Sequence, residues 1–210
     1  MKQIFYKLIF FYCLLFSVTN ISFAQITNDS SYIKEVRKLY DSVGKYYEID
    51  VRKTVELTSD LLEIAEQKKD TFTVIDALHL RARSSQHITE FYLSIEDFER
   101  ELRLLKTVKS ETTKEKLNRY SYLKEIEILA QLGQNYEEIG QIKNALEIYS
   151  KCVAIAEKEK LEFYKVIMPT LIANLYYKTG DYRKALKKEF ESFDGLKNSK
   201  KIDKINKIYH

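Results

Sequence analysis

Hydrophobic side chains recur every three or four residues along most of this chain, with polar residues between them. Leu57, Leu61 and Ile64 share one such stripe, and Ala145 and Tyr149 begin another further along. This spacing places side chains on one face of an α-helix, and a helix with one apolar face needs a neighbour to cover it. The pattern therefore predicts pairs of helices at about 31–69, 71–109, 113–160 and 161–198.

Two stretches in the second half of the chain match one another at a constant offset of 40 residues. Gly133 corresponds to Ala173, where a small side chain lets a neighbouring helix approach closely. Gly140 corresponds to Gly180, where we expect the first helix to end with left-handed backbone, and Asp181 is placed to cap the helix that follows. The residues that define the repeat are Leu132, Gly133, Tyr136, Gly140, Ala145 and Tyr149, followed by Ile172, Ala173, Tyr176, Gly180 and Ala185.

These residues resemble the tetratricopeptide repeat, whose usual period is about 34 residues. The longer offset places the extra length in the helix ends, and the family's tryptophan is absent. The resemblance is to an exported bacterial type with extended repeats of about 40 residues. It implies an all-α fold, a right-handed α-solenoid of about four antiparallel helix hairpins over residues 31–198.

A weaker copy of the repeat comes earlier in the chain. Ala82, Ser94 and Phe98 keep the internal spacing of the later repeat, but they lie 51 residues before their counterparts instead of 40. A polar insertion at residues 109–114 accounts for the excess.

The last predicted helix departs from the repeat. Glu189 stands where the preceding repeat has Tyr149. Leu186, Phe190 and Phe193 follow one another at helical spacing. We therefore expect these three side chains to form a substitute packing stripe in a slightly rotated helix.

Residues 199–210 form a Lys-rich segment that also carries an apolar stripe, made of Ile202, Ile205, Ile208 and Tyr209. A terminal repeat normally turns a polar face outward. This stripe is instead typical of the start of another helix. Two interpretations stay open: the segment folds back as a cap, or the chain is part of a longer parent protein.

The first 24 residues follow a different pattern. A basic start and an apolar run over residues 8–16 are followed by Ser22 and Ala24, small residues at the positions that signal peptidase reads. This order is typical of a secretory signal peptide, so we expect cleavage between Ala24 and Gln25 and export to the periplasm or cell envelope. The apolar run is shorter than the roughly 20 residues that span a bilayer. We expect membrane contact only if the segment is not cleaved, and we interpret residues 25–30 as a polar lead-in.

Composition supports long helices joined by short turns, because the 210 residues include one proline and five glycines. Cleavage would lower the formal charge from +4 to +2, which gives no reason to expect a nucleic-acid partner. It would also remove Cys13 and leave Cys152 alone, on the apolar stripe of a helix. We therefore expect Cys152 to be a buried structural thiol.

The sequence shows no pattern typical of an enzyme or of a cofactor site. His79 and His87 do not have the spacing of zinc ligands, and no glycine-rich phosphate loop or GxSxG motif is present. We expect no metal, no cofactor and no small-molecule substrate. Neighbouring carboxylates are interpreted as solvated helix faces.

The resemblance implies a non-catalytic scaffold in the cell envelope that binds a protein or peptide on the concave face formed by the first helix of each pair. The alternative is a sensory input domain, or a truncated remnant, of a larger envelope-spanning regulator. The residues that the resemblance places on the concave face are His79, Arg83, Gln86, His87, Gln134, Glu137, Glu138, Thr170, Asn174, Tyr177 and Lys178.

Three of these residues share one face of a helix, because His79, Arg83 and His87 are spaced by four. Such a stripe can hold a carboxylate of a peptide. Its two histidines would strengthen that contact as the pH falls through roughly 6.5. The other interpretation is an ordinary solvated helix face.

Overall fold

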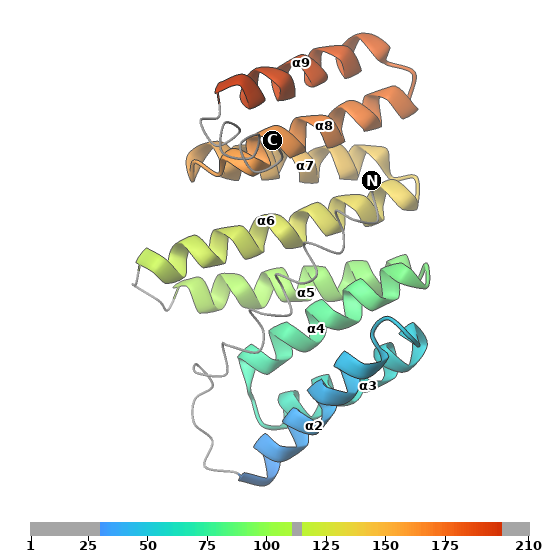
Figure 1. The fold of residues 1–210 in the computed structure, drawn as a ribbon, viewed down its shortest axis with the longest axis vertical. Coiled ribbons are helices and arrows are strands. Elements are labelled where there is room, and N and C mark those ends of the chain that lie inside the picture. The colour runs from blue at the N-terminus through green and yellow to red at the C-terminus, as the bar shows by residue number, and fades with distance from the viewer. Residues whose placement is uncertain (1–29, 111–114, 199–210) are drawn as a thin grey trace, which may run out of the picture. The chain divides into compact units, whose positions relative to one another are not determined.

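The computed structural model of the chain describes residues 30–110 and 115–198, and every element in these ranges is a helix. The expected pairs of helices are confirmed as hairpins joined by short turns (Figure 1). The helices are α2 (Ser30–Tyr46), α3 (Val51–Gln67), α4 (Thr71–His87), α5 (Phe91–Ser110), α6 (Glu115–Glu138), α7 (Ile142–Lys158), α8 (Glu162–Lys178) and α9 (Tyr182–Asn198).

Several expectations lie outside the described residues. They are the signal peptide at 1–24, most of the lead-in at 25–30, residues 111–114 of the polar insertion, and the apolar stripe in 199–210. Lys109 and Ser110, the first two residues of that insertion, belong to the end of α5. The described chain divides into two compact units, with the boundary between Ala77 and Leu78 inside α4.

The first unit contains α2, α3 and the beginning of α4. Leu61 and Ala65 of α3 are fully buried, and Val43 of α2 is buried too. The Tyr32 hydroxyl donates a hydrogen bond of 2.9 Å to a carboxylate oxygen of Asp70, which also caps the start of α4. Apolar packing and this polar contact together hold α2 beside the rest of the unit.

Helices in both units end in the same way, with one residue of left-handed backbone followed by a backbone hydrogen bond that spans five residues. Gly140 and Gly180 have φ values of 76° and 81°, so the expected left-handed helix ends are confirmed. After Gly140, the Gln141 amide donates to the Tyr136 carbonyl at 2.7 Å. The equivalent residues at three other turns are Lys69, Thr89 and Lys160.

Asp181 also takes its expected place, because its carboxylate accepts a hydrogen bond from the backbone amide of Lys184 at the start of α9. This bond satisfies one of the amide groups that the first turn of a helix leaves without a partner.

The main core of the second unit runs from Ala82 of α4 and Phe98 of α5 through α6 and α7 to α8. Gly133 of α6 lies against the ring of Tyr149 of α7. A Cβ atom at Gly133 would stand 2.5 Å from the ring atom Cε1 of Tyr149, closer than real atoms approach. Ala145 is fully buried, as expected of a small contact residue, and Ala185 is nearly so. The absence of a side chain at Gly133 is what allows the tyrosine ring into the core.

Other expected core residues follow this arrangement. Tyr149 and Cys152 are buried, whereas Tyr136 and Tyr176 are partly buried and pack against the core. Burial raises the pKa of the Cys152 thiol to about 12. The interpretation of Cys152 as a buried structural thiol is confirmed.

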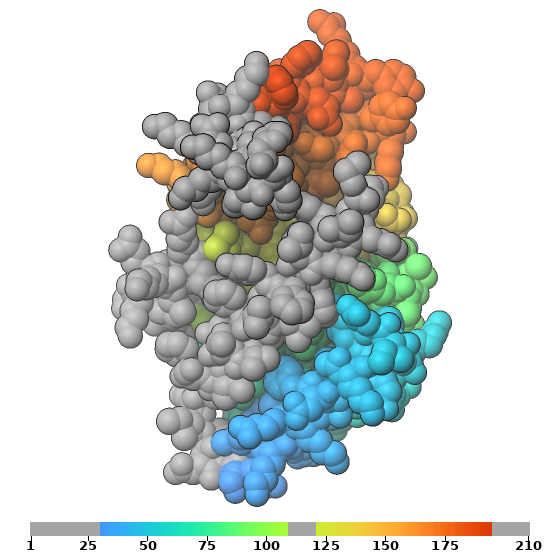
Figure 2. Space-filling view, viewed as in Figure 1, coloured from blue at the N-terminus to red at the C-terminus, as the bar shows by residue number. Residues whose placement is uncertain are grey.

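The expectation for α9 is wrong. Leu186, Phe190 and Phe193 are between 51% and 59% exposed, so they do not form a packing stripe. The helix packs through small side chains instead, because Ala185 and Ser192 are the buried residues among 182–194. The Ser192 hydroxyl donates to a backbone carbonyl of α8 at 2.9 Å. Figure 2 shows the surface of α8 and α9 in orange and red.

Candidate functional site

The residues proposed for the concave face lie on α4, α6 and α8, the first helices of three hairpins, and all of them belong to the second unit. They differ in exposure. Those that are exposed are His87, Glu138, Asn174, Tyr177 and Lys178. Those that are partly buried are Arg83, Gln86, Gln134, Glu137 and Thr170, and His79 is buried.

The stripe on α4 faces carboxylates that belong to the chain itself. The Nδ1 atom of His79 lies 3.1 Å from Oε2 of Glu101 on α5, and its Nε2 atom lies 3.8 Å from Oε1 of Glu127 on α6. Arg83 also reaches Glu127, with 3.8 Å between Nη1 and Oε1. Lys124 approaches Glu101 at 3.8 Å. The carboxylates that these side chains contact are therefore internal.

Burial determines the electrostatics of this cluster. It raises the pKa of Glu101, which is fully buried, to about 8, despite the nearby ammonium group of Lys124. It lowers the pKa of His79 well below 6.5, and partial desolvation together with the nearby Arg83 guanidinium lowers the pKa of the exposed His87. Both histidines thus gain a proton at lower pH than the sequence analysis supposed. A response to pH that depends on them falls below pH 6.5.

A second polar contact joins α4, α5 and α6. The Gln86 amide donates to the side-chain oxygen of Asn135 at 2.7 Å, and the Asn135 amide donates to the Ser94 hydroxyl at 2.8 Å. Asn135 is fully buried. A buried amide that is hydrogen-bonded at both ends fixes the register of the helices that it joins. Gln86 therefore has a structural contact that the spacing along α4 did not indicate.

The residues on α6 and α8 are more accessible. The Lys178 ammonium forms an ion pair with Glu137, which also accepts a hydrogen bond of 3.4 Å from the Tyr149 hydroxyl. Thr170 donates to the Ser192 hydroxyl of α9. Asn174 and Tyr177 lie on the exposed side of α8, and the Tyr177 ring is 66% exposed. These two side chains present a hydrogen-bonding amide and an aromatic surface.

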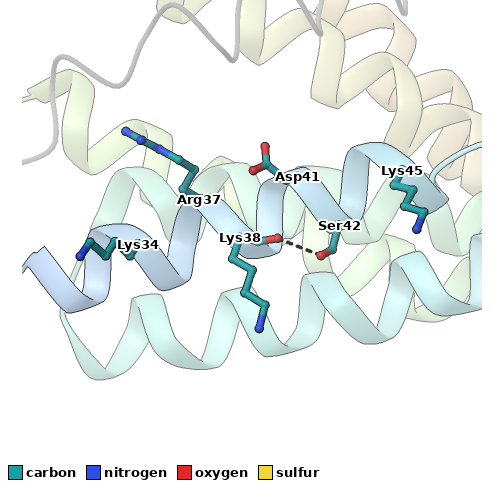
Figure 3. A pocket seen from close by; sticks show the side chains of 6 residues that line it. All are labelled: Lys34, Arg37, Lys38, Asp41, Ser42 and Lys45. Atoms are coloured by element: carbon teal, nitrogen blue, oxygen red, sulfur yellow. Dashed lines mark hydrogen bonds between the residues drawn. The ribbon is translucent and has the colours of Figure 1, made fainter.

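The first unit carries a charged stripe that the sequence analysis did not single out. Lys34, Arg37, Lys38 and Lys45 lie around an open depression on α2, together with Asp41. Figure 3 shows that the side chains lining it all come from this one helix, where the Ser42 hydroxyl donates to the Lys38 carbonyl. The recurrence of Lys and Arg every three or four residues in this part of the sequence could have indicated the stripe. No second element of the unit contributes a lining residue to this depression.

Nowhere in residues 30–110 and 115–198 do three histidine, cysteine or carboxylate side chains gather closely enough to hold a metal ion. None of the helices described is both long enough and apolar enough to cross a membrane.

The repeat in α6 and α7 matches a known family of protein repeats. The family model described as "Tetratricopeptide repeat" matches residues 126–159, which cover most of α6 and α7. No curated protein matches the sequence. Among solved structures, the chain is similar to the tetratricopeptide-like repeats of a putative kinesin light chain from Podosopora anserina. That similarity has 17% identity and a TM-score of 0.58, over 79% of this chain and 77% of that one.

Two further structures have the same fold. The apo form of RapI matches with 12% identity and a TM-score of 0.52, over 82% of this chain and 71% of that one. BtubC from P. vanneervenii matches with 14% identity and a TM-score of 0.52, over 70% of this chain. The chain spans 57% of the length of BtubC. At these identities the structures show the α-solenoid fold alone, and the expected extension of the repeat to about 40 residues stays a prediction from the sequence.

Proposed function

We propose, starting from the tetratricopeptide repeat at residues 126–159 and the α-solenoid fold around it, that this chain is a non-catalytic scaffold that binds a protein or peptide. Helical repeats of this kind generally mediate contacts between proteins. The observation that carries the proposal is the exposed pair Asn174 and Tyr177 on α8, within the face that the repeat uses for its partners.

The chemistry of this pair suits a peptide. An asparagine amide has two donors and an acceptor, so it can bond to the backbone of an extended chain. An exposed tyrosine offers apolar area and a hydroxyl at little cost in conformational entropy, which is why tyrosine is common in interfaces. Glu138 on α6 adds an exposed carboxylate. We propose a partner segment that presents backbone amides and at least one basic side chain.

The residues on α4 have a different role in the proposal. His79 is buried, and Arg83 and Gln86 are engaged with other parts of the chain. We therefore propose that these residues position α4 beside α6, and that His87 is the α4 residue closest to a partner. Any pH dependence of binding is expected below pH 6.5, because partial desolvation and the nearby Arg83 guanidinium lower the pKa of His87.

We propose the cell envelope as the place of action. The support is the sequence of residues 1–24 alone, which has the pattern of a signal peptide. The intact mass of protein recovered from the periplasm tests it, since a mass that includes residues 1–24 would replace cleavage with anchoring. The sensory alternative has no supporting observation in the helices or in the comparisons.

The binding proposal is tested by capturing partners from the exported fraction with the full chain and then measuring affinity for variants. We expect Asn174→Ala and Tyr177→Ala each to weaken binding about tenfold. The matched control is Tyr92→Ala. Tyr92 is 73% exposed, but it lies on α5, which is the second helix of its hairpin and therefore not one of the helices that form the proposed face. Equal affinity for all three folded variants would mean that the partner uses another surface.

A further inference from the structure

The exposed side of α2 is basic. It lies opposite the side of the helix that buries Tyr32 and Val43. At the rise of an α-helix, its basic residues extend over about 16 Å. Figure 3 shows their side chains along the one helix. We call these four exposed residues the α2 basic stripe: Lys34, Arg37, Lys38 and Lys45.

Neighbouring carboxylates do not neutralise the stripe. Within residues 30–110 and 115–198, none of its four side chains forms an ion pair. Lysines on other helices do pair within one helical turn, as Lys53 does with Glu56 and Lys188 with Glu191. Asp41 is the acidic residue that lies among the basic ones, so the stripe keeps a net positive charge.

Charge is unevenly distributed between the two helices that pack together in the first unit. Helix α2 has four basic and two acidic residues, whereas α3 has two basic and four acidic ones. The positive charge of this unit is therefore concentrated on the exposed side of α2. Such a local field favours an approach to a negatively charged surface in one orientation.

Two further features favour a lipid surface over an acidic protein. All the described residues that line the depression come from α2, so it has no second wall that would select one particular side chain. An exposed isoleucine lies near each end of the stripe, because Ile33 is 41% exposed and Ile49, in the turn to α3, is 79% exposed. An anionic bilayer offers both dispersed negative charge and an apolar interior.

We propose that the α2 basic stripe binds the surface of a bilayer that contains anionic phospholipid. The ammonium and guanidinium groups lie at the headgroup phosphates, and Ile33 and Ile49 enter the boundary between headgroups and acyl chains. The apolar run at residues 8–16, retained or cleaved, is a separate means of membrane contact. The proposal concerns the first unit, so it stands whether or not the second unit binds a peptide.

Vesicle binding tests the proposal with the full chain as it is recovered after export. Affinity is measured for vesicles of phosphatidylglycerol and for vesicles of phosphatidylcholine, and the readout is the ratio of the two affinities. We expect a ratio of about twentyfold or more at low salt, because each cation near an anionic surface contributes about fivefold. Raising NaCl from about 50 mM to about 500 mM should remove most of this preference.

Two double variants locate the contact. Arg37→Gln with Lys38→Gln should lower the ratio about tenfold or more, since two cations are lost from the stripe. The matched control is Lys143→Gln with Lys151→Gln, which removes the same charge from two exposed lysines of α7 in the second unit. It should change the ratio less than about twofold. Circular dichroism checks that both variants keep their helices.

Three results would overturn the proposal. The first is equal affinity of the unaltered chain for the two kinds of vesicle. The second is an equal loss in both double variants, which would assign the preference to the net charge of the whole chain. The third is binding to soluble polyglutamate, weakened by the α2 variant, without any preference for anionic vesicles. That result would assign the stripe to an acidic protein.

Discussion

The second unit packs its helices in two different ways. Where α6 meets α7 and α8, the core is apolar and close, with the Tyr149 ring against Gly133 and Ala145 fully buried beside them. Where α4 and α5 meet α6, the apolar core continues through Ala82 and Phe98, and His79 and Glu101 are also buried there, surrounded by further charged side chains. One unit thus contains a region of apolar packing and a region where buried charged side chains accompany the apolar core.

The two regions contribute differently: apolar packing mainly stabilises the fold, and the polar contacts mainly determine how the helices align. Apolar burial is favourable wherever shapes fit, so the α6–α7–α8 core supplies free energy of folding. A buried charged cluster costs desolvation that its internal contacts only partly offset. The separate hydrogen bond from Gln86 to Asn135 forms in only one register of the helices. We infer that the polar cluster aligns α4 and α5 on α6 more than it stabilises them.

The largest effect is expected from Tyr149→Ala in the apolar core. Removing a fully buried aromatic ring leaves a cavity opposite Gly133, which has no side chain to fill it. The free energy of unfolding should fall by about 3–5 kcal/mol. Denaturant titration measures the loss, with Tyr92→Ala as the exposed control, expected within about 0.5 kcal/mol of wild type. A loss below about 1 kcal/mol would mean that the ring is not packed as described.

The polar cluster should make stability depend on pH. The pKa of Glu101 is about 8 in the folded protein, raised by burial above its usual 4.5. The folded state therefore keeps a proton that the unfolded state has lost, and the stability that this proton confers is lost as the pH rises through 8. The lowered pKa of His79 acts oppositely, but only below pH 6.5.

We therefore expect the free energy of unfolding to fall by about 1–2 kcal/mol between pH 6.5 and pH 8. Urea titrations at the two pH values measure the fall. Glu101→Gln should abolish it, because the amide does not ionise. The same fall in that variant would place the titrating group elsewhere.

The smallest effect on stability is expected in the turns of the α4–α5 and α6–α7 hairpins. The left-handed position is occupied by Thr89 between α4 and α5, with φ of 63°, and by Gly140 between α6 and α7. A β-branched residue is strained in this conformation, whereas glycine is not. We expect Thr89→Gly to raise the free energy of unfolding by about 0.5 kcal/mol and Gly140→Ala to lower it by about 1 kcal/mol. Changes of opposite sign in the free energy of unfolding for the two variants would confirm that Thr89 is strained and Gly140 is not. Changes of the same sign would contradict it.

Part of the candidate site could be predicted from spacing along one helix. The repeat register identified Asn174 and Tyr177, which are exposed on α8. The same register selected His79, which is buried against Glu101. Helical spacing shows which side chains share a face, but it does not show that a neighbouring helix brings acidic residues to that face.

What the sequence by itself determined was the repeat. Gly133 and Gly140 are informative alone, because close helix contact and left-handed backbone both favour a residue without a side chain. What only the tertiary structure decided was which faces have a neighbour. The stripe of Leu186 and Phe190 identifies the apolar side of α9, yet these residues are exposed while Ala185 is buried. An apolar stripe shows which residues share one face of a helix. Whether those side chains are buried depends on a second helix that packs against that face.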